Sequence, residues 1–133
     1  MRAVDTNVLI RLLTRDEPIQ ARAAEAWVSA AGQVWVSHVV LAECMWVLES
    51  VYARSRVQLV AAIETLIDHR TIVLEDTDAV SDALEEFRDR AAPGFSDCLV
   101  LALARRAGHL PLATFDRRLG RLEDAVRIGP KRP

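Results

Sequence analysis

The sequence is poor in the residue types that mark several large classes of protein. It has two cysteines, Cys44 and Cys98, and neither belongs to a CxxC or Cys/His pair of the kind that binds zinc. Each lies in an apolar stretch with a helical pattern, so we expect two buried free thiols and a reducing, cytoplasmic environment. No signal segment opens the chain, and no apolar run reaches the roughly 18 residues that a membrane-spanning helix needs. We therefore expect no association with a membrane.

Neither positive nor negative charge dominates the sequence. Lysine occurs once, at Lys131, and the formal net charge is −2. This balance argues against binding nucleic acid through bulk charge, so any contact with phosphate has to come from local arginines. With 133 residues, 51% of them hydrophobic and 27% charged, the chain is expected to form a globular domain with a substantial core.

Short apolar runs alternate with helical patterns along the whole chain. Strands are expected at residues 2–5, 33–37, 71–74, 110–114 and 125–128. Helices are expected at residues 7–14, 18–30, 38–52, 55–68, from 77 or 78 onward, 96–107 and 117–122. The helices at residues 38–52 and 55–68 follow each other without a strand between them, which indicates an αα-hairpin inserted into the alternating pattern. The sequence thus predicts one domain over residues 1–133, a three-layer α/β/α fold with a four- to five-stranded parallel sheet, and a short polar tail at residues 129–133.

Small polar residues mark where the helices begin. Thr6 or Asn7 is expected to cap the first helix, whereas Asp5 lies one residue too early to be the likeliest cap. Ser37, Ser55 and Ser96 are expected to cap three later helices, and Ala23, Ala26, Trp27 and Ala30 to form one face of the second helix.

Four acidic residues depart from the pattern of their own element. Asp5 and Asp116 follow strands, at the carboxyl edge where parallel sheets bind ligands. Asp97 lies in the first turn of a largely apolar helix, and Glu43 lies among apolar neighbours with no arginine or lysine within one turn. Because helices that follow parallel strands begin at the same edge, all four carboxylates can converge on one site.

Three of the four acids also have a purely structural interpretation. Asp97 suits a first helical turn because of the helix dipole, and Asp116 suits a cap for the segment that follows it. Glu43 would then lie at the edge of its apolar face and reach water or a distant arginine.

Taken together, the four acids require compensation, because like charges at about 4 Å repel by about 4 kcal/mol at an effective dielectric of 20. Oxygen ligands select Mg²⁺ or Mn²⁺ over zinc, and such sites support displacement at phosphorus. Thr6 and Thr114 are expected to support the carboxylates through hydrogen bonds.

Four segments occur in an order and at a spacing that resemble a known family. They are Val4–Asn7, Ser37–Glu43, Phe95–Asp97 and Ala113–Asp116. Together they resemble the signatures of PIN-domain nucleases, and most of all the bacterial VapC-type toxins of toxin–antitoxin pairs. The resemblance covers nearly the whole chain. It implies a Mg²⁺- or Mn²⁺-dependent endoribonuclease that cleaves a cellular RNA and is neutralised by a VapB-like antitoxin.

The resemblance also implies roles for particular residues. Asp5, Glu43 and Asp97 would be metal ligands, and Asp116 would bind a second metal or a bound water; all four would be catalytic. Thr6, Asn7 and Thr114 would be supporting polar residues.

Other readings remain open at this point. A Mg²⁺-dependent phosphatase would require a second aspartate two residues after the first, where this chain has Asn7. A non-catalytic RNA- or protein-binding domain could retain the same pocket. Metal-dependent RNA cleavage separates both from a nuclease.

Arginines and tryptophans suggest two contact surfaces. Arg11, Arg15, Arg117 and Arg118 follow the first and last acidic motifs, and they are either RNA backbone contacts or solvated helix surface. The dependence of RNA affinity on salt distinguishes the two roles. Trp27, Trp35 and Trp46 exceed what one small sheet face needs, so part of their surface is expected to meet a second copy or an antitoxin, with core packing as the alternative.

Overall fold

Five short strands, all in parallel pairs, form two sheets in the computed structural model, which describes residues 1–129. The chain divides into two compact units, Met1–Thr77 and Asp78–Pro133. The predicted tail at residues 129–133 lies outside the described residues except for Gly129. Among residues 1–129, no helix combines the length and the apolar character that crossing a membrane requires.

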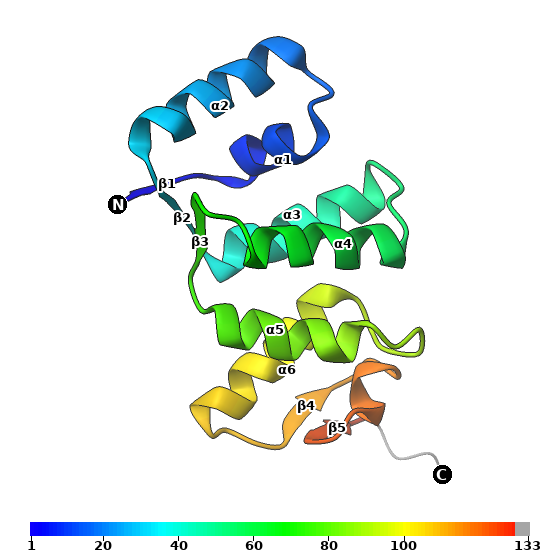
Figure 1. The fold of residues 1–133 in the computed structure, drawn as a ribbon. Coiled ribbons are helices and arrows are strands. Elements are labelled where there is room, and N and C mark those ends of the chain that lie inside the picture. Colours follow the sequence, from blue (N-terminus) through cyan, green and yellow to red (C-terminus); the bar gives the residue numbers. More distant parts are fainter. Residues whose placement is uncertain (130–133) are drawn as a thin grey trace. The chain divides into compact units, whose positions relative to one another are not determined.

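The first unit is built around a three-stranded sheet in the order β1-β2-β3 (Figure 1). Its strands are β1 (Arg2–Ala3), β2 (Val34–Val36) and β3 (Ile72–Leu74), and Trp35 is paired with both Ala3 and Val73. Helices α1 (Thr6–Thr14) and α2 (Pro18–Ala31) connect β1 to β2, and α3 (His38–Ser50) and α4 (Arg56–Ile67) connect β2 to β3. The predicted αα-hairpin of α3 and α4 is therefore confirmed.

Burial explains this arrangement. Val34 and Val36 are fully buried, and the apolar sides of the helices pack around them. The buried helical residues include Leu9, Ile10, Leu41, Met45, Leu59, Ile63 and Leu66. Removing such side chains from water contributes about 25 cal/mol per Å² of apolar surface, which is the main stabilising term for a unit of this size.

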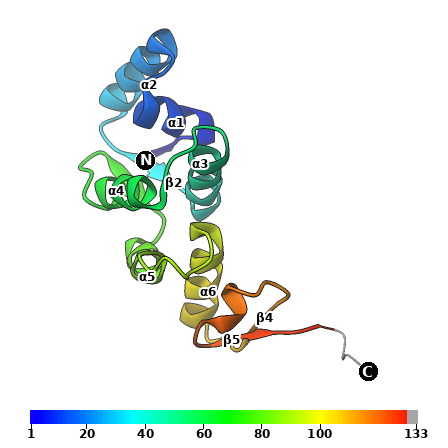
Figure 2. The ribbon, with the colours of Figure 1, turned by 90° about the vertical axis from the view of Figure 1, so that its right-hand side faces the viewer.

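The second unit contains α5 (Thr77–Phe87, whose first residue ends the first unit), α6 (Phe95–Ala107), β4 (Leu112–Thr114), the 3₁₀ turn η1 (Leu119–Arg121) and β5 (Ala125–Arg127). Strands β4 and β5 form a two-stranded parallel sheet in which Ala113 pairs with Val126. The edge-to-face contact of Phe87 and Phe95, with ring centroids 5.7 Å apart, joins α5 to α6 in the core of this unit. Figure 2 shows β4 and β5 beside each other in a second view.

The α/β class and the five parallel strands agree with the sequence prediction. The strands are hydrogen-bonded as a three-stranded sheet in the first unit and a two-stranded sheet in the second, in keeping with the predicted three-layer α/β/α fold. In α2, Ala21 and Val28 are buried, while the face that carries Ala23, Ala26 and Ala30 is exposed.

Candidate active site

Asp5 lies at the carboxyl end of β1, where the chain turns into α1. Val4 is buried and its N–H continues the ladder by donating to the carbonyl oxygen of Trp35 at 3.2 Å. Asp5 has an extended backbone, and its Oδ1 accepts a hydrogen bond from the N–H of Val8 at 3.1 Å. Asp5 is therefore the N-cap of α1, and the expectation that Thr6 or Asn7 caps this helix is wrong. Thr6 is instead buried in the first turn, and Asn7 is exposed.

Glu43 lies on the exposed side of α3. That helix begins at the same edge of the sheet as Asp5, because Ser37 directly follows β2 and its Oγ accepts a hydrogen bond from the N–H of Val40 at 3.1 Å. Val39 and Trp46, one turn to either side of Glu43, are 74% and 63% exposed. The neighbours of Glu43 are thus apolar, as predicted, but this face is open to solvent and is not a buried one.

Asp97 and Asp116 interact electrostatically in the second unit. Asp97 lies in the first turn of α6, which begins after the N-cap Gly94, so the prediction that Ser96 caps this helix is wrong. Partial burial raises the pKa of the Asp97 carboxyl above its usual range, and the negative charge of Asp116 raises it further. The structure therefore brings together two carboxylates that come from segments 19 residues apart in the chain.

Asp116 is held in place by three hydrogen bonds. Its N–H donates to Thr114 Oγ1 at 3.0 Å, its Oδ2 accepts from the N–H of Leu119 at 2.8 Å, and its carbonyl accepts from the N–H of Gly120 at 3.0 Å. Thr114 thus holds the backbone of Asp116, and Asp116 also caps the 3₁₀ turn η1. The cap uses one carboxylate oxygen of Asp116.

The four acids are divided between the two units, Asp5 and Glu43 in the first and Asp97 and Asp116 in the second. Within neither unit do the described residues gather three or more His, Cys, Asp or Glu side chains into a group able to hold a metal ion. The donor chemistry of the Asp97–Asp116 pair nevertheless suits a divalent cation, because a cation bound between two carboxylates relieves their repulsion.

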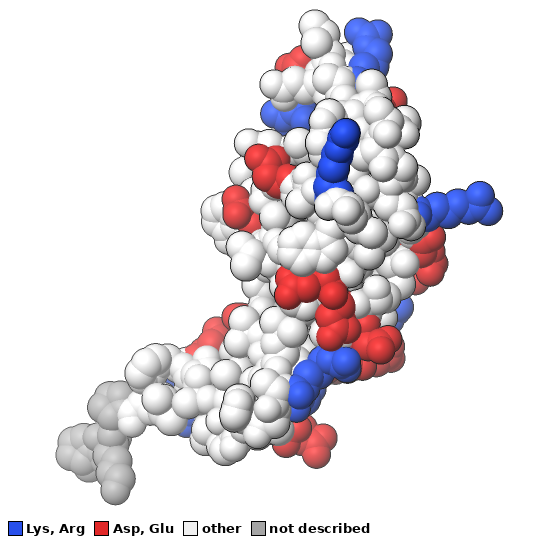
Figure 3. Space-filling model, turned by 90° about the vertical axis from the view of Figure 1, so that its left-hand side faces the viewer, with Lys and Arg blue, Asp and Glu red and all other residues white. Residues whose placement is uncertain are grey.

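The four arginines that follow the acidic motifs have different surroundings. Arg15 forms an ion pair with Glu25, and Arg11 is held by several hydrogen bonds to its neighbours. Arg117 and Arg118 are exposed, and their guanidinium groups make no hydrogen bond or ion pair with the described residues of their unit. On the face shown in Figure 3, basic and acidic side chains are interspersed, in keeping with the near-neutral net charge.

The PIN domain family matches residues 2–125, which is nearly the whole chain. The chain belongs to the PIN domain family. No curated protein and no solved structure matches it. PIN domains are generally nucleases that bind divalent metals such as Mg²⁺, so membership of the family indicates a nuclease-type function that acts on RNA.

A groove beside Asp5 in this PIN domain was not predicted from the sequence. It has a volume of about 660 Å³ and lies between β1, the first turn of α1 and α2. Gln20, Ala23, Ala24 and Trp27 line it from α2, at positions that share one side of a helix. That spacing was the available signal, because the sequence places Ala23 and Trp27 on one face of the helix.

Proposed function

We propose that this PIN domain is a Mg²⁺- or Mn²⁺-dependent endoribonuclease of the VapC toxin type. The observation that carries the proposal is the Asp97–Asp116 carboxylate pair in a chain that matches the PIN family from residue 2 to residue 125. A partly buried carboxylate beside a like charge is costly to maintain, and hydrolytic sites use such pairs to hold cations.

Asp5, Glu43, Asp97 and Asp116 are the proposed ligands of the metal within a single domain over residues 1–133. The ion, when bound, supplies activation of a water molecule and stabilisation of negative charge on the phosphate. The protein's own contribution is orientation. The amides of Val8 and Leu119 each fix one oxygen of Asp5 and Asp116, respectively, and Thr114 fixes the backbone beside Asp116.

Three partners complete the proposal. The RNA substrate would be contacted outside the groove by Arg117 and Arg118, whose guanidinium groups have no partner among the described residues of their unit. If Arg117→Ala leaves the slope of RNA affinity against salt concentration unchanged, Arg117 touches no phosphate. A VapB-like antitoxin would neutralise the enzyme in the cytoplasm.

The third partner is a second copy of the chain. Val39 and Trp46 expose apolar surface on α3 that a homodimer would cover. Light scattering at micromolar concentration is expected to give the mass of a dimer, and a clean monomer would contradict this part of the proposal.

Cleavage of total RNA tests the nuclease function directly. Wild-type protein with Mg²⁺ or Mn²⁺ is expected to give discrete cuts that EDTA abolishes, and Asp5→Asn is expected to abolish them without unfolding the protein. Asparagine caps helices about as well as aspartate, so the hydrogen bond from Val8 is retained while the charge is lost.

A matched control is available at Asp68, an exposed residue at the end of α4. Asp68→Asn removes the same charge from the same unit and is expected to leave cleavage unchanged. Full activity of Asp5→Asn would end the proposed mechanism.

A further inference from the structure

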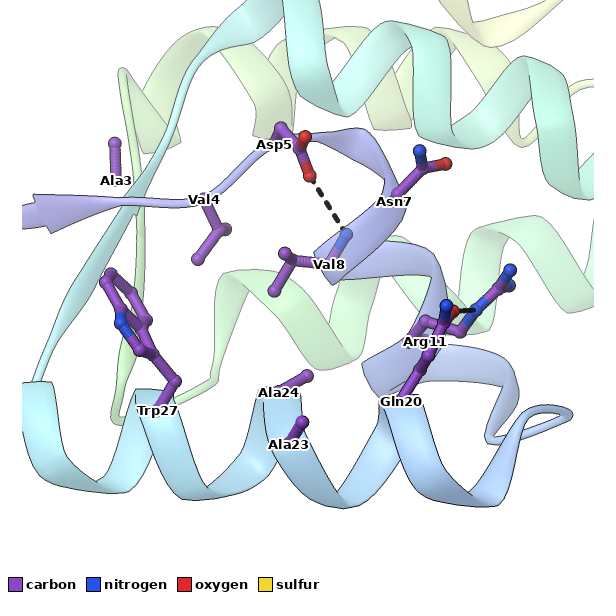
Figure 4. A pocket seen from close by; sticks show the side chains of 10 residues that line it. All are labelled: Ala3, Val4, Asp5, Asn7, Val8, Arg11, Gln20, Ala23, Ala24 and Trp27. Atoms are coloured by element: carbon purple, nitrogen blue, oxygen red, sulfur yellow. Dashed lines mark hydrogen bonds between the residues drawn. The ribbon is translucent and has the colours of Figure 1, made fainter.

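The groove beside Asp5 combines an apolar wall with polar groups at its ends (Figure 4). Gln20 and Trp27 are seven residues apart on α2, which corresponds to about 10 Å along a helix. Asp5 and Asn7 line the groove from the start of α1, so a molecule in the groove lies next to the carboxylate that we assign to the metal. A groove of this volume is within the usual range of about 300–1,000 Å³ for ligand sites.

Arg11 is fixed in this groove with part of its hydrogen-bonding capacity unused. Its Nε donates to Gln20 Oε1 at 2.6 Å, and its Nη1 donates to Asp16 Oδ1 at 3.4 Å and to the Tyr52 hydroxyl oxygen at 3.2 Å. The Tyr52 hydroxyl in turn donates to Asp16 Oδ2 at 2.7 Å. A guanidinium has five N–H donors, so the two on Nη2 remain without a partner among the described residues of this unit.

The wall of the groove suits a flat apolar group. Ala23 and Ala24 leave room because their side chains are small, and Trp27 remains 42% exposed. The guanidinium of Arg2 lies 5.3 Å from the centroid of the Trp27 ring, which supports the orientation of the indole. Single-stranded RNA is commonly bound by stacking its unpaired bases on such aromatic side chains.

We propose that this groove binds one nucleotide of the RNA substrate next to the bond that is cleaved. The base would pack against Trp27 and the two alanines, and Arg11 Nη2 would donate to an oxygen of the sugar–phosphate backbone. The inference rests on the proposed nuclease function, because that function places the cleaved phosphate at Asp5. An apolar peptide would fill the same volume but would leave the Nη2 donors unpaired, so a nucleotide fits the groove better.

Filling the groove tests the inference without disturbing the Arg11 network. Ala23→Leu adds bulk at an exposed groove position, and Ala26→Leu makes the same change at an exposed position of α2 outside the groove. We expect Ala23→Leu to weaken the binding of a fluorescent single-stranded RNA oligonucleotide about tenfold in EDTA, as for the loss of one stacked base, and Ala26→Leu to change it by less than about twofold.

A second pair of variants tests the arginine. Arg11→Lys keeps the positive charge but loses the planar fork, and Arg22→Lys makes the same change at an exposed position of α2 outside the groove. We expect only Arg11→Lys to weaken RNA binding, with both proteins melting close to the wild-type temperature.

The possible failures are distinguishable. Equal RNA affinity of Ala23→Leu and Ala26→Leu, or no measurable binding of RNA by the wild type in EDTA, would overturn the groove assignment even if the wild type cleaves RNA. Groove-dependent binding by a wild-type protein that cuts no RNA in Mg²⁺ or Mn²⁺ would support the groove and overturn the nuclease function alone.

Discussion

At the scale of single residues, two of the candidate ligands serve as caps as well. Asp5 Oδ1 accepts from Val8, and Asp116 Oδ2 accepts from Leu119. The sequence suggests capping and metal binding as alternative roles for Asp116. A carboxylate has two oxygens and the cap uses only one, so the two roles are compatible. A capping amide also fixes the direction of the second oxygen, which is what a ligand with a defined geometry requires.

Cys44 gives a prediction about reactivity. Burial raises the pKa of its thiol to about 12, and the negative charge of Glu43 adds to the shift. At pH 8 only about one thiol in ten thousand would be ionised, and the thiolate is the reactive form. We expect Ellman's reagent to leave Cys44 unmodified in a Cys98→Ala protein until guanidinium unfolds it.

The raised pKa also fixes how this reactivity depends on pH. Modification of the folded protein should rise only as the pH approaches 12, in contrast to an ordinary thiol, which becomes reactive near pH 8.5. Rapid labelling of the native protein at pH 8 would show that the helix around Cys44 opens frequently or that the thiol is accessible.

At the scale of helices and strands, the αα-hairpin offers a test of a capping motif. Ser55 Oγ accepts from the N–H of Gln58 at 3.2 Å, and Gln58 Oε1 accepts from the N–H of Ser55 at 2.8 Å. This capping box satisfies two amides at the start of α4. We expect Ser55→Ala to lower the free energy of unfolding by about 1 kcal/mol in urea denaturation.

The control for this prediction is Ser50, which lies in the last turn of α3. Its hydroxyl donates to the carbonyl oxygen of Trp46 at 2.6 Å, and that oxygen already belongs to the helix. Ser50→Ala should therefore change stability by less than about 0.5 kcal/mol. Equal effects of the two substitutions would mean that the capping box contributes nothing specific.

The start of a helix was predictable where a single side chain in the right position can cap it. Ser37 and Ser55 cap α3 and α4 as the sequence indicates, because each hydroxyl directly precedes an apolar helical run. The prediction that Ser96 caps α6 was wrong because Gly94 adopts an extended backbone and the helix begins at Phe95, ahead of the serine. Asp5 was missed as a cap because the helix begins one residue earlier than the apolar pattern suggests.

Strand existence was predictable, but the pairing of strands was not. The two to three residues that form each strand carry apolar patterns that mark them as strands. Pairing depends on contacts between distant segments, and strands this short contain too few residues to specify a neighbour. The sequence accordingly predicted five parallel strands but did not predict which of them pair with one another.

At the scale of the whole molecule, the ordered acidic motifs predicted more than any single element could. Each acid alone has a structural explanation, and the order of all four along the chain is what indicates the PIN family. The groove was not predicted because its residues form no recognisable motif. It is formed by small alanines and by the network around Arg11, and none of these residues is unusual on a helix surface.

The proposed binding of a metal ion by Asp5, Glu43, Asp97 and Asp116 gives a prediction that does not depend on cleavage. A ligand that binds only the folded state stabilises it by about 2.7 kcal/mol at 100 times its Kd, which for a chain of this size raises the melting temperature by several degrees. The three tryptophans, Trp27, Trp35 and Trp46, all lie in the first unit, so their fluorescence reports on that unit alone.

We therefore expect Mg²⁺ to raise the melting temperature measured by tryptophan fluorescence, and Asp97→Asn in the second unit to abolish the increase. Asp97→Asn also removes a repulsion with Asp116, so each variant must be compared with itself in EDTA and in Mg²⁺. Asp78→Asn, at an exposed position of α5, is the control and should retain the full increase. If Asp97→Asn also retained it, while Asp5→Asn lost it, the cation would bind the first unit without Asp97, and the proposed set of four ligands would be wrong.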